Sequence, residues 1–174
     1  MIADFDTIAG CLLGGALGDA VGAHFEGSEP SDEFELPDTL RITDDTQLTI
    51  ATCEAIIESG RVKVESVADH FVRWFRERRL RGLGSSTLKA LKELEVGGHW
   101  ALVGASGERA AGCGAAMRIA PLAFFLDPDV DEERQMIRDV CRITHRNDEA
   151  YLGALTIVHT LRHVVSGGGL DVSI

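Results

Sequence analysis

The segment of residues 43–60, TDDTQLTIATCEAIIESG, begins with a run of polar residues, continues without glycine or proline, and ends in a glycine. We expect a helix from about Thr46 to Ser59, ended by Gly60 in the left-handed conformation that glycine adopts most readily. Two adjacent carboxylates, Asp44 and Asp45, stand where the preceding loop enters this helix. The segment therefore predicts a helical fold with a concentration of acidic side chains at one helix start.

The rest of the chain has the same helical periodicity, and no strand–helix alternation interrupts it. Further helices are expected over residues 6–22, 87–94, 115–125 and 131–144, and from Ser66 and Asp148 onward. Pro121 should kink one of them, and Ser66, Asp131 and Asp148 should cap three others. We therefore expect an all-α, compact multi-helix bundle, with one domain over residues 1–165, an exposed loop over residues 27–42 and a flexible tail over residues 166–174.

The charge of the chain excludes some partners. The formal net charge of the 174 residues is -11, which repels nucleic-acid backbones and disfavours a general nucleic-acid role. An acidic protein can still bind a phosphate-rich small molecule, through a local group of donors or a bound cation. A divalent metal ion is therefore a reasonable expectation for this chain.

The N-terminal sequence favours a cytoplasmic protein with no role for a membrane. It lacks a basic region before its apolar stretch, and that stretch, residues 8–25, is interrupted by Asp19 and five glycines. The four cysteines form no CxxC pair, as expected of reduced thiols. The glycines also weaken the first helix, which indicates close approach of a helix or ligand, or simply loose packing.

Thr43, Asp44 and Asp45 offer oxygen ligands only, which suit magnesium or manganese rather than zinc. Taken alone, the same residues could equally form an ordinary helix cap. Glu26, shortly after the sequence GDAVG of residues 18–22, could serve as a proton-transfer group beside this site. The alternative for Glu26 is a solvated side chain after a helix end.

Two later motifs could contact an anionic ligand. The sequence GCGAAMR, residues 112–118, places glycines before an expected helix, where free backbone amides could hold a diphosphate. A plain glycine turn is the alternative, and Arg118 could anchor a carboxylate or solvate its own turn. His145 lies at a joint between two helices, where its ring could contact a ribose or base or be purely structural.

In order along the chain, these motifs resemble the ADP-ribosylglycohydrolase family. The resemblance runs from about Ile8 to Val165 and combines GGALGDAVG with Glu26, TDDT at residues 43–46, GCGAAMR followed by Pro121, and the pair Thr144 and His145. It implies an all-helical fold around two magnesium or manganese ions and hydrolysis of a glycosidic bond in ADP-ribosylated proteins or small ADP-ribose conjugates.

The resemblance also implies roles for individual residues. Thr43, Asp44 and Asp45 would be metal ligands, with Glu26, Asp44 and Asp45 acting in catalysis. Substrate contacts would come from Gly84, Ser85, Gly112, Cys113, Gly114 and His145.

One departure concerns the metal ligands. The family has a later Asp-x-Asp-Thr/Ser segment that completes the metal pair, and nothing after Thr46 matches it; Asp127 and Asp129 have the spacing but no following hydroxyl residue. The chain is therefore expected to be an N-terminal portion that self-associates or uses a complementing chain. The alternatives are an ADP-ribose or nucleotide-binding relative without turnover and a purely structural relative.

Overall fold

The computed structural model describes residues 3–29 and 35–169, whose regular secondary structure is almost entirely helical. The α-helices are α1 (Phe5–Phe25), α2 (Asp44–Ser59), α3 (Val64–Arg76), α4 (Ser85–Glu95), α5 (Trp100–Val103), α6 (Asp131–Arg142) and α7 (Asp148–Val165). Three 3-10 turns, η1 (Glu108–Ala110), η2 (Ala116–Arg118) and η3 (Ala120–Phe124), lie between α5 and α6. The all-α expectation is confirmed.

One short parallel pairing was not expected from the sequence. Strand β1 (Ala105–Ser106) pairs with β2 (His145–Arg146), so that Ala105 faces His145. Each strand has two residues, too few to leave a period-two pattern in the sequence. The pairing fixes His145 beside the segment that leads into the glycine motif.

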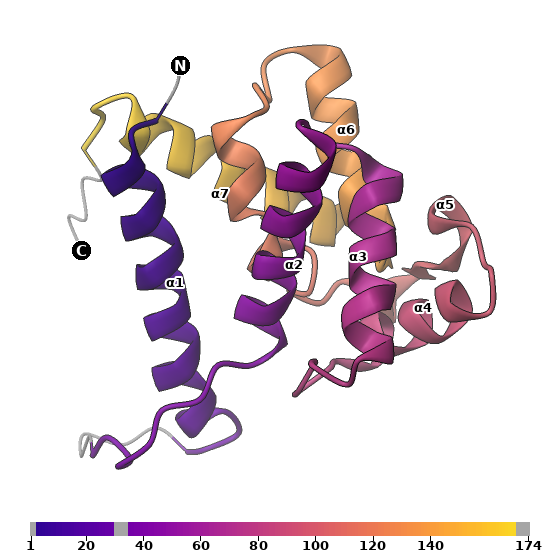
Figure 1. Ribbon diagram of the computed structural model, residues 1–174, viewed down its shortest axis with the longest axis horizontal. Coiled ribbons are helices and arrows are strands. Elements are labelled where there is room, and N and C mark those ends of the chain that lie inside the picture. The colour runs from indigo at the N-terminus through magenta and orange to yellow at the C-terminus, as the bar shows by residue number, and fades with distance from the viewer. Residues whose placement is uncertain (1–2, 30–34, 170–174) are drawn as a thin grey trace.

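The core is built around α2 and α3, with α6, α7 and η3 closing it (Figure 1). Leu48 of α2, Phe71 of α3, Leu122 of η3 and Ile137 of α6 are fully buried and belong to one apolar cluster. The left-handed Gly60, with φ of 68°, ends α2 as predicted. Because α2 is central, its N-terminal residues are held on a rigid element.

Helix α1 lies at one edge of the molecule, beside α2 (Figure 1). Phe5 and Leu13 of this helix are 81% and 71% exposed. In length and composition α1 is apolar enough to cross a membrane, contrary to the expectation; core helices of soluble proteins and signal sequences share these properties. At its C-terminal half, however, Asp19 is hydrogen-bonded to the start of α2.

Several local expectations were wrong at helix ends. Helix α3 begins at Val64, and the Ser66 hydroxyl instead donates to the Ala55 carbonyl. Asp131 and Asp148 are the first residues inside α6 and α7 rather than their caps. The cap of α7 is Asn147, whose side chain accepts hydrogen bonds from two backbone amides of the first turn.

The helix expected over residues 115–125 is two 3-10 turns, η2 and η3. Pro121 has no amide hydrogen and disfavours α-helical geometry at the residue before it, which favours two short turns over one continuous α-helix. Residues 30–34 of the expected loop and residues 170–174 of the expected tail lie outside the described residues. The described residues on either side of the first gap, 26–29 and 35–43, form the loop that was expected.

Candidate functional site

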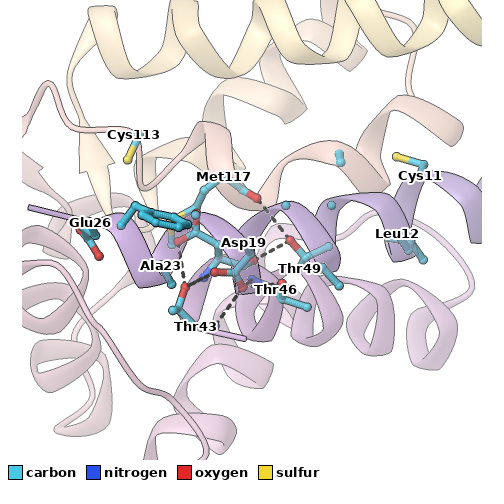
Figure 2. Close-up of a pocket in the computed structure, with 17 residues that line it drawn as sticks. Cys11, Leu12, Asp19, Ala23, Glu26, Thr43, Thr46, Thr49, Cys113 and Met117 are labelled. Atoms are coloured by element: carbon cyan, nitrogen blue, oxygen red, sulfur yellow. Dashed lines mark hydrogen bonds between the residues drawn. The ribbon is translucent and has the colours of Figure 1, made fainter. Parts of the chain in front are cut away.

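Asp19 of α1 caps the start of α2 from a neighbouring helix (Figure 2). Its carboxylate accepts hydrogen bonds from the backbone amide and hydroxyl of Thr43 at 2.8 and 2.6 Å. It also accepts the backbone amide and hydroxyl of Thr46 at 3.3 and 2.6 Å. One carboxylate therefore satisfies two orphan amides at the N-terminus of α2 and ties α1 to it.

The sequence analysis did not predict that Asp19 caps α2. It treated Asp19 only as part of the GDAVG motif near the end of the first helix. Burial raises the pKa of the Asp19 carboxyl, but the hydrogen bonds from Thr43 and Thr46 outweigh this effect and hold the pKa below its usual value. Asp19 is thus ionised, and both of its carboxylate oxygens accept hydrogen bonds from the start of α2. A carboxylate inside a helix has no cap of its own helix to form, but nothing in the sequence indicates which distant residues it contacts.

The two adjacent acids of α2 are less well compensated. Burial and the charge of Asp45 raise the pKa of Asp44 to about 6, although the backbone amides of Asp44 and Gly84 oppose the shift. Burial and the charge of Asp19 likewise raise the pKa of Asp45, with Thr43 opposing and Glu26 adding to the shift. Within the described part of the chain, none of these carboxylates forms a salt bridge. The site therefore holds excess negative charge.

A cavity of about 560 Å³ adjoins these acids and lies between α1, the start of α2 and η2. Its volume is in the range of small-molecule sites. Asp45 and Glu26 line it, whereas Asp44, only 5% exposed, does not. In the view of Figure 2, Glu26 lies toward one end of the cavity and Cys11 toward the other, with Asp19 between them.

The glycines of α1 face this open space. Gly15, Gly18 and Gly22 line the cavity, and an added Cβ at any of them would meet no atom of the described chain within 4 Å. Close helix packing therefore does not explain these glycines in the described part of the protein. Their position is consistent with the approach of a ligand, which was the other expectation.

The oxygen donors fit a hard divalent cation in chemical type but are incomplete in number. Thr43 and Asp45 place oxygens at the cavity, and the raised pKa values of Asp44 and Asp45 show charge that a cation would offset. Among residues 3–29 and 35–169, however, no three His, Cys, Asp or Glu side chains are grouped so that they could hold a metal ion.

Gly84 and Ser85 are not in the cavity wall, and the Gly84 backbone amide hydrogen-bonds Asp44 instead. Gly84 precedes α4, and Ser85 is its first residue. In the same turn, Gly82 has a φ of 80°, and a Cβ there would lie 3.2 Å from Asp44 Oδ1. The turn thus packs glycine backbone against the buried face of Asp44, which a larger residue would disturb.

The glycine motif of residues 112–114 lies against His145. A Cβ at Gly114 would fall 2.5 Å from His145 Cε1, and one at Gly112 would fall 3.8 Å from His145 Nε2. Cys113 between them is exposed and lines the cavity. Because η2 has only three residues, the expected anion site at a helix N-terminus has no support from the fold.

Arg118 is fully buried and anchors no carboxylate of the described residues, but it does bond the backbone of its own turn, which was the alternative expectation. Its guanidinium donates to the carbonyls of Gly114 and Val140 and to the Thr144 hydroxyl, at 3.0, 3.2 and 2.8 Å. It lies over the Phe71 ring, 4.6 Å from the centroid. Burial lowers the pKa of Arg118 to about 10, so that the side chain remains charged at neutral pH.

The fold and the site define a class: an all-helical protein with an acidic, oxygen-rich pocket between its first two helices. Residues 2–173 match the ADP-ribosylglycohydrolase family, and the chain belongs to this family. The resemblance inferred from the sequence motifs is thereby confirmed.

Individual relatives agree with this assignment. The chain is 30% identical over 183 residues to an ADP-ribosylarginine hydrolase of Serratia proteamaculans, covering 95% of this chain and 49% of the relative. It is 26% identical to the ADP-ribosyl-[dinitrogen reductase] glycohydrolase of Rhodospirillum rubrum, covering 95% and 60%. A solved ADP-ribosylglycohydrolase-related protein complex matches with a TM-score of 0.75 and 29% identity, over 94% of this chain and 58% of that one. The chain thus spans about half to three fifths of these proteins.

Proposed function

We propose that this chain takes part in magnesium-dependent hydrolysis of the glycosidic bond in ADP-ribosylated proteins or small ADP-ribose conjugates, releasing ADP-ribose. The observation that carries the proposal is the uncompensated acidic cluster beside a cavity of ligand size. Membership of the ADP-ribosylglycohydrolase family supports the substrate class.

In this proposal Thr43, Asp44 and Asp45 hold the cation, of which a complete site has two. A bound magnesium ion supplies positive charge that lowers the pKa of water and offsets the charge of the substrate phosphates. The described carboxylates are too few for a complete site, so the proposal includes self-association of this chain, in which a second copy brings further oxygen ligands.

The protein's own side chains have separate tasks. Asp19 fixes Thr43 and Thr46 and so sets the position of the α2 start. Glu26 and Asp45 present carboxylates to the cavity, where they stabilise positive charge that develops at the anomeric carbon. We assign the binding of ADP-ribose to Gly84, Ser85, Gly112, Cys113, Gly114 and His145, as the family resemblance implies.

The test is release of ADP-ribose from an ADP-ribosyl-arginine protein by the purified chain in the presence of magnesium. Asp45→Asn should reduce release about 100-fold, because it removes a carboxylate from the cavity while keeping its shape. The matched control is Asp131→Asn, the same change at a side chain that is 85% exposed on α6. Equal rates for the two variants, or no release above the Asp44→Ala/Asp45→Ala background, would contradict the proposal.

A second candidate is binding of ADP-ribose without turnover. The small number of carboxylates grouped within the described residues favours it. Calorimetry with ADP-ribose, with and without magnesium, distinguishes the two. Binding without product release supports the second candidate, and absence of binding in both conditions eliminates both.

A further inference from the structure

The hydroxyl of Thr144 connects a buried arginine to a histidine at the glycine motif. Arg118 Nη2 lies 2.8 Å from Thr144 Oγ1, and His145 Nδ1 lies 2.9 Å from the same oxygen. Thr144 is fully buried, so water does not reach this oxygen. The proton positions in this chain of three groups can therefore be worked out from their donor and acceptor capacities.

Arginine can only donate, so Thr144 Oγ1 accepts a hydrogen bond from Arg118. The single hydroxyl proton of Thr144 then needs an acceptor, and His145 Nδ1 is the one hydrogen-bond partner of this hydroxyl, apart from Arg118, within the described residues. With the proton of the imidazole on Nδ1 instead, the buried hydroxyl proton would have no acceptor, at a cost of about 1–3 kcal/mol. The buried hydroxyl of Thr144 has both a donor and an acceptor only when Nδ1 accepts and Nε2 carries the proton.

Charge acts in the same direction. Burial and the nearby Arg118 charge lower the pKa of His145 to about 4, so that the imidazole is neutral at pH 7. Its Nε2 makes no hydrogen bond within residues 3–29 and 35–169, and it faces the backbone of residues 112–114. Only glycine at position 114 allows the loop to lie this close to the ring.

We propose that Arg118 and Thr144 are positioning residues that hold His145 as the neutral Nε2–H tautomer, with its N–H presented at the glycine motif to an oxygen acceptor of the ligand. The tautomer itself does not depend on the proposed function. The identity of the acceptor, an oxygen of the ADP-ribose moiety, rests on it.

The test is a nitrogen-15 NMR spectrum of the histidine rings of the full chain at pH 7, in which protonated and unprotonated ring nitrogens are resolved. His145→Gln identifies the signals. We expect an unprotonated Nδ1 and a protonated Nε2 for His145. In Thr144→Val the preference of His145 for the Nε2–H tautomer should be lost, since the change removes the hydroxyl at nearly constant volume. In Thr144→Ser, which keeps the hydroxyl, the preference should be retained.

His99 provides an internal control, because its Nδ1 accepts a hydrogen bond from the Ala101 amide, independently of Thr144. Its signals should be the same in all variants. A protonated Nδ1 in wild-type His145, or an unchanged tautomer in Thr144→Val, overturns the proposal. If Thr144→Val does not fold, the wild-type spectrum still decides the tautomer.

Calorimetry with ADP-ribose tests the role of the tautomer in binding. Thr144→Val should weaken binding about tenfold, and Thr144→Ser should remain close to wild type. Absence of binding by the wild-type chain would contradict the proposed function while the NMR result stands by itself. Equal affinities for wild type and Thr144→Val, with the tautomer changed, would show that Nε2 does not contact the ligand.

Discussion

The start of α2 and the surroundings of Arg118 differ in the sign of their unpaired charge and in its access to solvent. At the start of α2, Asp44 and Asp45 are carboxylates without a cationic partner in the described chain, next to a cavity. Arg118 is a cation without a carboxylate partner among residues 3–29 and 35–169; it is buried in the core, and two of its guanidinium nitrogens donate to carbonyl and hydroxyl oxygens. The acids therefore have charge available for a ligand. The hydrogen bonds of Arg118 instead hold the loop that contains Gly114, and through Thr144 they hold His145.

The largest effect is expected where the charge is sealed from solvent. Arg118→Met should lower the free energy of unfolding by about 3 kcal/mol, because it leaves the Gly114 and Val140 carbonyls without their donor. Chemical denaturation measures the change. Arg142→Met, at an arginine of α6 that is 43% exposed, should cost less than about 0.5 kcal/mol. Similar losses for the two variants would remove the distinction between a sealed and an open charge.

Asp19→Asn should be next, with a loss of about 2 kcal/mol in the free energy of unfolding, since an amide cannot accept all the hydrogen bonds from Thr43 and Thr46. The lowered pKa of Asp19 adds a pH dependence: its stabilisation is present above the unfolded-state value near 3.8 and is lost as pH falls through the folded-state value. Asp38→Asn, at an exposed loop residue, is the control and should be neutral.

Asp44 should give the opposite pH dependence. Because its pKa is raised to about 6, the folded state binds more protons than the unfolded state between pH 3.8 and 6, and stability falls as pH rises through this interval. The expected fall is about 1 kcal/mol after allowance for partial screening by solvent around the helix start. Thermal denaturation across this range measures it.

Two further measurements check the assignment to Asp44. Asp44→Asn should abolish its share of the slope, and magnesium should reduce the slope more than sodium chloride at equal ionic strength. A slope that survives Asp44→Asn unchanged would locate the titrating group elsewhere.

The smallest effect concerns the turn that packs against Asp44. Gly82→Ala and Gly27→Ala both place a side chain at positive φ, at 80° and 75°, with a shared cost of about 1 kcal/mol. Only the first also brings a Cβ to 3.2 Å from Asp44 Oδ1, which should add about 0.5 kcal/mol to its loss in unfolding free energy. Equal losses in the two variants would mean that the Asp44 side chain can move away from the new Cβ, which would contradict tight packing of Gly82 against Asp44.

Features fixed by short-range rules could be predicted from the sequence. The course of α2 and its left-handed Gly60 follow from local periodicity and from the conformational freedom of glycine. Helix ends were predicted less well: the cap of α7 was assigned one residue too late, because Asn147 and Asp148 both offer a side-chain oxygen and only the backbone path decides between them. The cap of α6 is Val130, whose side chain forms no capping hydrogen bond and leaves no signal in the sequence. The 3-10 geometry around Pro121 likewise depends on which hydrogen bonds remain after the proline removes one.

Features that depend on distant contacts could not be predicted. Asp19 and Thr43 are 24 positions apart, and no periodic pattern links a carboxylate on one helix to the amides of another. A single arginine in a glycine-rich motif resembles a solvated residue, so the burial of Arg118 had no signal in the sequence. The order of the motifs along the chain nevertheless identified the family, because several weak motifs in a fixed order are far more specific than any one of them.

The hydrogen bonds of Asp19 have a consequence for motion. The same carboxylate that attaches α1 to α2 also forms part of the cavity wall, so docking of this edge helix and formation of the pocket are one event. Any molecule that binds in the pocket must, by mass action, favour the docked helix over the detached one. Amide protons of α1 should therefore exchange with solvent more slowly when the pocket is filled, which makes this helix a reporter of occupancy that requires no knowledge of the reaction.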